Sequence, residues 1–127
     1  MQLAYTILYV EDVPQTLAFY AKAFGLNQRF LHEGGDYGEL ETGATRLAFS
    51  SRKLMRELGK KPASANADAP CFEIAFTTDD VEAAIDRAVA AGARLMQPPK
   101  SMPWGQTIAY IADLEGFLIE LCTPMPG

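Results

Sequence analysis

The stretch EDVPQTLAFYAKAFG (residues 11–25) has a counterpart in TDDVEAAIDRAVAAG (residues 78–92), and this repetition decides the fold. In the first stretch Asp12 is a suitable N-cap, Pro14 fits the first turn, and Gly25 supplies the stop. Apolar residues recur between them at helical spacing. The first stretch therefore predicts an amphipathic helix.

The second stretch repeats this pattern at a constant distance along the chain. Asp80, or its neighbour Asp79, is the expected N-cap, and a glycine again ends the helix. Aligning Asp12 with Asp80 gives an offset of 68 residues, and the same offset places Tyr5 on Glu73. An internal duplication of this kind is the strongest guide to the fold.

Strand patterns flank both predicted helices in the same order, one before and three after. Turn residues such as Gly34-Gly35 and Pro98-Pro99 separate them. Each half thus reads β-α-β-β-β, which places the chain in the α+β class. The predicted strands cover residues 3–10, 27–33, 36–41 and 45–51 in the first half, and 71–78, 93–97, 105–112 and 117–122 in the second.

The length of 127 residues predicts a single domain, 1–127, built from these two halves. Module one covers about residues 1–51, and module two covers about residues 71–124. The linker at about 52–70 is rich in Ala, Ser, Asn, Asp and Pro towards its end, while its start, RKLMREL, favours a short helix.

The composition restricts the function classes. A net charge of −5 argues against nucleic-acid binding, which needs clustered basic residues. The N-terminal sequence resembles no secretory signal, and no apolar run is long enough to span a bilayer, so we expect a cytoplasmic protein. Cys71 and Cys122 lie inside predicted strands and are expected to be buried free thiols.

Alternation along the strands separates a core face from a polar face. In the strand at 71–78, Phe72, Ile74 and Phe76 share the core face, so Glu73 points the other way. By the same rule Glu120 points away from the core. In the strand at 45–51, Leu47 and Phe49 face the core, while Arg46, Ala48 and Ser50 face away. Such a face suits either a ligand pocket or a solvated outer surface, and periodicity alone leaves both open.

Three segments carry a family resemblance: LAYTILYVEDVPQTLAFYAKAFGL, DDVEAAIDRAVAAGARL and PWGQTIAYIADLEGFLIEL. In their order and spacing the chain resembles the vicinal oxygen chelate superfamily, which includes glyoxalase I, extradiol dioxygenases and bleomycin-resistance proteins. The resemblance implies paired βαβββ modules that form a U-shaped mixed sheet around a cavity, often in a homodimer.

The resemblance also implies where a metal would bind in the metalloenzyme members of the family. The corresponding positions here are Tyr5, Ala48, Glu73 and Glu120, where enzymes similar to glyoxalase I have His, Glu, His and Glu. The only histidine, His32, is not at such a position. No metal cofactor is therefore expected, although Glu73 and Glu120 with Tyr5 leave open a site for an oxygen-preferring ion such as Mn or Mg.

Two functions follow from these residues. The first is a metal-free small-molecule-binding protein similar to the bleomycin-resistance type, in which glutamates attract a cationic ligand and Trp104 stacks on it. The second is a lyase or isomerase similar to glyoxalase I, with Glu73 or Glu120 as general base. Alternatively, Arg46 neutralises one glutamate. The expected ligand-binding residues are Tyr5, Arg46, Ala48, Glu73, Trp104, Tyr110 and Glu120, with Tyr37 as a further rim aromatic.

Overall fold

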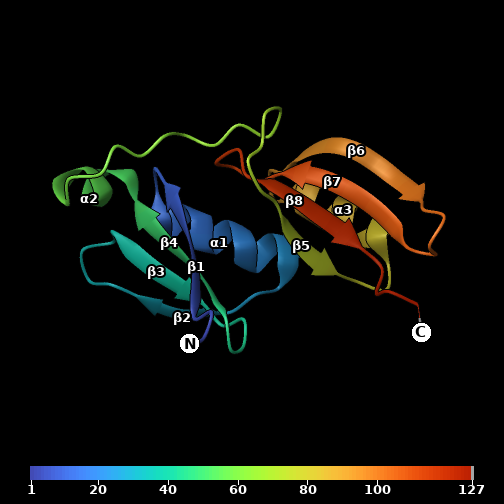
Figure 1. Cartoon of the computed structure of the whole chain (residues 1–127), viewed down its shortest axis with the longest axis horizontal. Coiled ribbons are helices and arrows are strands. Elements are labelled where there is room, and N and C mark those ends of the chain that lie inside the picture. The colour runs from blue at the N-terminus through green and yellow to red at the C-terminus, as the bar shows by residue number, and fades with distance from the viewer. Residues whose placement is uncertain (127) are drawn as a thin grey trace. The chain divides into compact units, whose positions relative to one another are not determined.

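A computed structural model describes residues 1–126 and shows two compact units, Met1–Ser64 and Ala65–Gly127 (Figure 1). Each unit contains one four-stranded mixed sheet and runs in the order β-α-β-β-β, with one short additional helix in unit 1. The predicted α+β class and the duplicated module are confirmed. The division between the units falls inside the predicted linker.

Unit 1 has the strand order β1-β4-β3-β2, in which β1 and β4 run parallel and the other neighbours antiparallel. The parallel pair is connected through the helix and the two intervening strands. Its elements are β1 (Tyr5–Val10), α1 (Val13–Phe24), β2 (Gln28–Leu31), β3 (Tyr37–Leu40), β4 (Arg46–Ser51) and α2 (Arg52–Glu57).

Unit 2 repeats this arrangement with the order β5-β8-β7-β6 and one parallel pair, β5 and β8. The equivalent strands therefore occupy equivalent places in both sheets. Its elements are β5 (Ile74–Thr77), α3 (Val81–Ala90), β6 (Arg94–Ser101), β7 (Thr107–Ala112) and β8 (Leu118–Cys122).

The predicted helix boundaries are confirmed by their caps. The carboxylate of Asp12 accepts a hydrogen bond from the backbone N–H of Gln15 at 3.0 Å, and Asp80 does the same for Ala83 at 3.0 Å. After α1, Gly25 takes φ = 70°, a left-handed conformation that favours glycine.

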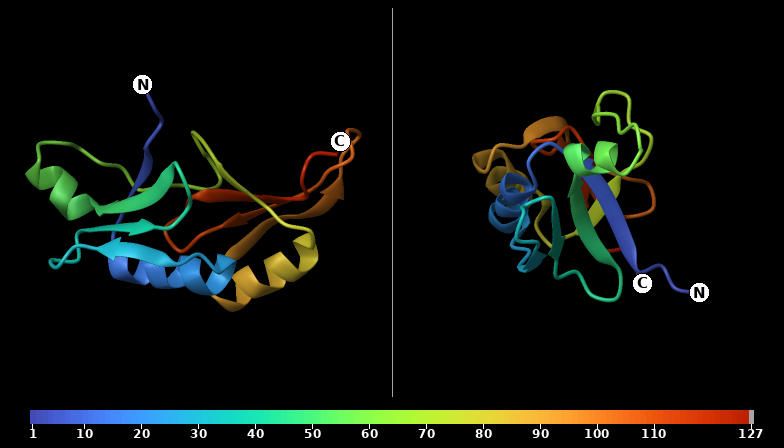
Figure 2. Two further views of the ribbon diagram at one scale, coloured as in Figure 1. Left: turned by 90° about the horizontal axis from the view of Figure 1, so that it is seen from below. Right: turned by 90° about the vertical axis from the view of Figure 1, so that its left-hand side faces the viewer.

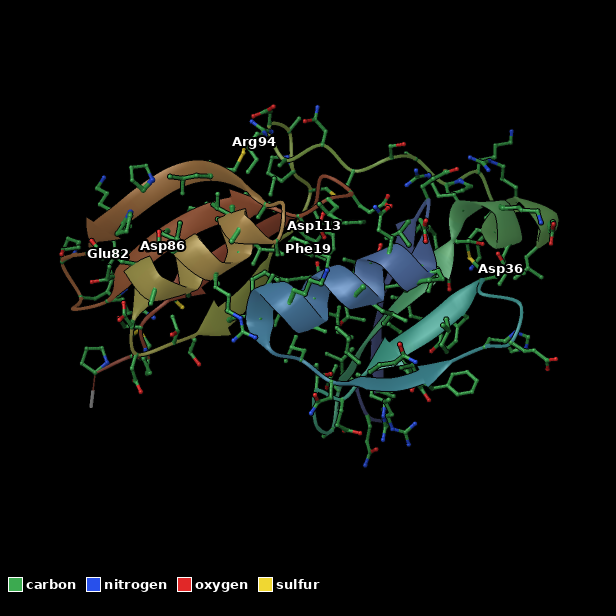
Figure 3. All side chains as sticks on the ribbon, turned by 180° about the vertical axis from the view of Figure 1, so that it is seen from behind. Phe19, Asp36, Glu82, Asp86, Arg94 and Asp113 are labelled. Carbon is green, nitrogen blue, oxygen red and sulfur yellow. The ribbon has the colours of Figure 1, made fainter. Side chains whose placement is uncertain are left out.

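The short helix predicted at the start of the linker is α2. Ser51 caps it, because its Oγ accepts a hydrogen bond from the backbone N–H of Leu54 at 3.0 Å. The same hydroxyl donates to Oδ1 of Asp36 at 2.7 Å, and Figure 3 shows Asp36 beside α2. This bond ties the loop before β3 to the end of β4.

In unit 1 helix α1, and in unit 2 helix α3, covers one face of the unit's own sheet (Figure 2). In unit 1 the contact with α1 is close at Gly38 of β3, where an added Cβ would lie 2.6 Å from Cδ1 of Leu17. The fully buried side chains on this face of unit 1 include Leu8, Val10, Leu40 and Phe49. In unit 2, Ile111, Ile119 and Leu121 of the sheet and Ile85 and Ala88 of α3 are buried.

Three expectations about unit 2 are wrong. Strand β5 begins only at Ile74, so Glu73 lies just before the strand rather than within it. Phe72 is 45% exposed instead of buried, and Cys71 is exposed as well. All three precede the first residue that pairs with β8, so the core does not enclose them.

The prolines at positions 98 and 99 do not end a strand, because β6 runs from Arg94 through them to Ser101. Strand β6 lies at the edge of the sheet, and its pairing with β7 shifts register around the prolines. An edge strand tolerates proline, since one of its sides has no neighbour to receive the missing N–H. The two prolines were therefore wrongly predicted to form a turn, because β6 lies at the edge of the sheet and can include them.

Candidate functional site

Each sheet has a second face, opposite its helix, and this face carries the residues of interest. Cross-strand partners point to the same side of a sheet. In unit 1, Tyr5 pairs with Arg46, Ile7 pairs with Ala48, and Ala48 also pairs with Glu39. The predicted residues Tyr5, Arg46 and Ala48 are therefore on one face, away from the α1 side.

Glu39 is the centre of a polar cluster on this face of unit 1. Its side chain is buried, yet it receives a hydrogen bond from the Tyr37 hydroxyl to Oε2 at 2.7 Å. Its Oε1 lies 3.3 Å from Nη1 of Arg29 and 3.8 Å from Nε of Arg46. Within unit 1, the carboxylate that pairs with Arg46 is thus Glu39, which is not among the predicted site residues.

The electrostatics of Tyr37 show how closely this cluster is assembled. Burial raises the pKa of Tyr37 most, and its hydrogen bond to Glu39, the charge of Glu39 and the proximity of Tyr5 raise the pKa further, while Arg46 lowers it. The hydroxyl therefore keeps its proton and acts as a donor to Glu39. We refer to Arg29, Tyr37, Glu39 and Arg46 as the Glu39 cluster.

Exposed apolar side chains border the Glu39 cluster. Tyr5 and Ile7 of β1 are each 47% exposed, whereas Ala48 is fully buried in β4. Glu39 could have been found from the sequence, because alternation along DYGELE puts it on the same face as Tyr37. Nothing in the sequence indicated that Glu39 would be buried.

In unit 2 the corresponding face carries Glu120 of β8. Glu120 pairs with Ala75 of β5 on one side and with Tyr110 of β7 on the other. Glu73 lies just before β5, two residues ahead of Ala75; it is exposed, and its charge acts on both Glu120 and Tyr110. The structure therefore brings together three of the predicted site residues, Glu73, Tyr110 and Glu120.

The negative charge of this group is reflected in its titration. The pKa of Glu120 is raised by burial and by the charge of Glu73, and the Tyr110 hydroxyl and the Cys122 thiol oppose this rise. The pKa of Tyr110 is raised by burial and then by the two glutamates. Cys122, which is buried as predicted, also has a raised pKa because of burial and Glu120.

No basic side chain within residues 1–126 forms an ion pair with Glu73 or Glu120. Two carboxylates that interact without a counter-ion are relieved by a proton or by another positive group. This arrangement can attract a cation, or it can hold a proton on Glu120 at a higher pH than usual.

Trp104 lies in the loop between β6 and β7 and is 52% exposed. Its Nε1 donates to Oε1 of Gln106 at 2.7 Å, and Nε2 of Gln106 donates to the carbonyl oxygen of Thr123 at 2.8 Å. Through Gln106, these bonds link the half-exposed indole ring to Thr123, the residue after β8. Within the described residues, its one side-chain hydrogen bond is to Gln106.

The His, Cys, Asp and Glu side chains in the described part of the chain do not form a metal site with three or four protein ligands. Residues 1–126 contain no group of three or more His, Cys, Asp or Glu side chains placed to hold an ion. Glu73 and Glu120 offer two carboxylates, and zinc sites in proteins typically use three or four protein ligands. His32 is exposed, and its Nδ1 accepts from the backbone N–H of Gly34 at 3.2 Å.

Comparisons with known proteins agree with this architecture. The family model of the Glyoxalase/Bleomycin resistance protein/Dioxygenase superfamily matches residues 2–121. No curated protein matches the chain. None of the helices in the described residues is long and apolar enough to cross a membrane.

Solved structures with this fold come from several bacteria. A glyoxalase-related enzyme from Fulvimarina pelagi superposes with a TM-score of 0.84 at 23% identity, over 98% of this chain and 88% of that one. A glyoxalase/bleomycin resistance protein/dioxygenase family enzyme from Burkholderia phytofirmans PsJN gives 0.78 at 22% identity, over 97% and 98%. TioX from Micromonospora sp. ML1 gives 0.72 at 22% identity, over 97% and 98%. At such identities the likeness establishes the fold.

Proposed function

Because the chain belongs to the Glyoxalase/Bleomycin resistance protein/Dioxygenase superfamily, we propose that it is a metal-free small-molecule-binding protein of this family. The observation that carries the proposal is the Glu73–Glu120 pair, which forms no ion pair with a basic side chain within residues 1–126. Burial and then the charge of Glu73 raise the pKa of Glu120. A ligand with an ammonium or amidinium group would supply the missing positive charge.

The neighbours of the pair support an aromatic cation as the ligand. The Tyr110 ring lies next to Glu120 across the β7–β8 ladder. Aromatic faces attract cations as well as planar groups. Trp104 offers a further half-exposed indole ring in the same unit, with its Nε1 hydrogen bonded to Gln106. The other residues that we assign to ligand binding, Tyr5, Arg46 and Ala48, belong to unit 1.

Calorimetric titration of the protein with benzylamine tests this proposal, with benzyl alcohol as the uncharged analogue. Benzylamine should bind and benzyl alcohol should not. Glu120→Gln should weaken binding about tenfold, which corresponds to 1.4 kcal/mol. Glu82→Gln makes the same charge change on the exposed side of α3 and should leave binding unchanged.

The pH dependence and the metal content sharpen this test. Binding should weaken as the pH falls through the raised pKa of Glu120, because protonation removes the attracting charge. Elemental analysis after dialysis tests the metal-free part of the proposal. A stoichiometric divalent ion that is lost in Glu120→Ala would contradict it.

The raised pKa of Glu120 also favours a second candidate, a glyoxalase-like isomerase or lyase. A carboxylate with a pKa nearer neutrality is a better general base, since it can take a proton from a carbon next to a carbonyl and return it to the adjacent carbon. Proton exchange into deuterated water from the thiol adduct of methylglyoxal, followed by NMR, measures this activity. Turnover that survives in both Glu73→Gln and Glu120→Gln would exclude the glutamates as the base.

The cytoplasmic location, the homodimer and the absence of nucleic-acid binding stay predictions. Light scattering with size-exclusion chromatography gives the mass in solution and so decides the oligomeric state. A mass near 13.9 kDa would indicate a monomer, and twice that mass a homodimer.

A further inference from the structure

We propose that the Arg46 guanidinium, on the helix-free face of unit 1, binds a carboxylate group of a ligand. This inference rests on the proposed function, which already counts Arg46 among the ligand-binding residues, and it names the ligand group that Arg46 would bind. It rests on the hydrogen bonds that the Glu39 cluster makes and on one that it lacks.

The missing bond is at Arg46 itself. Its Nε is buried and has no hydrogen-bond partner among the described residues. The facing carboxylate oxygen, Oε1 of Glu39, is 3.8 Å away, which is beyond hydrogen-bond distance. A buried N–H without an acceptor is costly, so an oxygen placed beside it would be favoured.

Glu39 does not need Arg46 as its main partner. Tyr37 donates to one carboxylate oxygen at 2.7 Å, and Arg29 approaches the other at 3.3 Å. The ion pair with Arg46 is the longest contact of the three. Arg46 can therefore turn towards a ligand while Glu39 stays hydrogen bonded and its charge stays compensated.

The surroundings of Arg46 suit a carboxylate on a flat apolar frame. Its side chain is 28% exposed, so solvent and ligands reach part of it. Tyr5, its partner in the β1–β4 ladder, is 47% exposed and offers a ring face beside it. The planar guanidinium fork matches a carboxylate in a bidentate arrangement. A doubly charged phosphate is less suitable, because Glu39 would repel it more strongly.

NMR titration of the full chain with benzoate tests this inference directly. The Nε–Hε resonance of Arg46 is assigned by its loss in Arg46→Gln. Benzoate should shift this resonance saturably at millimolar concentration, and benzamide, the neutral analogue, should not. An unmoved resonance, or an equal shift with benzamide, overturns the inference.

Two variants separate a carboxylate site from a simple effect of charge. Glu39→Gln removes the competing charge but keeps an acceptor for Tyr37, so benzoate should bind about fivefold more tightly. Arg94→Gln makes the same charge change as Arg46→Gln at an exposed ion pair with Asp68 in unit 2, and should leave benzoate binding unchanged. If Arg94→Gln weakens binding as much as Arg46→Gln does, net charge is the cause and the site is rejected.

The same samples distinguish this inference from the proposed function. Benzylamine binding reports on Glu73 and Glu120, while the Arg46 resonance reports on unit 1. If benzylamine binds and benzoate does not, only the carboxylate site at Arg46 is refuted. If benzoate binds and benzylamine does not, only the cation site at Glu73 and Glu120 is refuted.

Discussion

The two units share one topology but place their carboxylates differently. Glu120 on β8 pairs with Tyr110, and the equivalent pair in unit 1 is Ala48 on β4 and Glu39 on β3. The glutamate has thus moved to the neighbouring strand in unit 1. There a tyrosine and two arginines compensate it, whereas Glu120 lies near a second glutamate.

This difference shows that the surrounding charges, rather than the strand position, decide whether a carboxylate is available. Glu39 is buried and its carboxylate is already engaged by the Tyr37 hydroxyl and by Arg29, so it is not available to a ligand. Glu120 interacts with Glu73 and forms no ion pair with a basic side chain in residues 1–126. Three variants test this contrast and a fourth compares the helix-facing sides of the two sheets; they follow in order of decreasing effect.

Ala48→Glu should have the largest effect, because it gives β4 the carboxylate that β8 already has. Ala48 is fully buried opposite Glu39, so a new glutamate would place a second negative charge in a buried site. We expect the free energy of unfolding to fall by about 3–5 kcal/mol in urea titrations. Adding Glu39→Ala should restore part of the loss, because Tyr37 and Arg29 can then serve the new carboxylate. Strict additivity of the two changes would contradict this shared role.

Gly38→Ala compares the helix-facing sides of the two sheets. Its equivalent in unit 2 is Ala109, since Gly38 pairs with Phe49 and Ala109 pairs with Leu121. A methyl group at position 38 meets Leu17 at 2.6 Å, so the variant should lose about 1–3 kcal/mol of stability. The reverse change, Ala109→Gly, should cost only about 0.5–1 kcal/mol. A loss for Gly38→Ala no larger than that for Ala109→Gly would contradict a close contact between Leu17 and β3.

Glu39→Gln should destabilise the protein by about 1–2 kcal/mol, because two charge-assisted contacts of a buried group become weaker. Thermal unfolding at neutral pH measures the change. The conservative replacement keeps the volume and the acceptor for Tyr37, so cavity formation does not contribute. If Glu39→Gln were as stable as the unmodified protein, the ion pairs of Glu39 with Arg29 and Arg46 would not contribute to the free energy of unfolding.

Glu120→Gln should act in the opposite direction and stabilise the protein by about 0.2–1 kcal/mol at neutral pH. The raised pKa means that the folded state holds the Glu120 proton more tightly than the unfolded chain does. Stability should therefore fall as the pH rises from the ordinary glutamate value of 4.5 through the raised pKa.

Urea midpoints of Glu120→Gln and the unmodified protein, compared between acidic and neutral pH, measure this slope. Glu120→Gln should flatten it, because the variant has no proton to lose at this position. Glu82→Gln, at an exposed position of α3, is the matched control and should keep the slope. A slope that persists in Glu120→Gln would assign the titration to another group.

Much of the fold could be predicted because its signals are local. The caps Asp12 and Asp80 and the stop at Gly25 gave both main helices with nearly correct bounds. Alternation placed Arg46 and Ala48 away from the core side of β4. The errors at Phe72 and at the prolines of β6 arose because strand ends and edge strands depend on the neighbouring strand, which a local pattern does not contain.

For the candidate site, too, some features could be predicted from the sequence and others could not. The sequence by itself determined which residue types face away from the helices, because side chains alternate along a strand with a fixed period. It therefore placed Glu73 and Glu120 on the same face of unit 2. It did not determine the partners, because cross-strand register sets them over long sequence separations. Only the tertiary structure decided that Glu39 holds Arg29 and Arg46, while Glu120 is left beside another carboxylate.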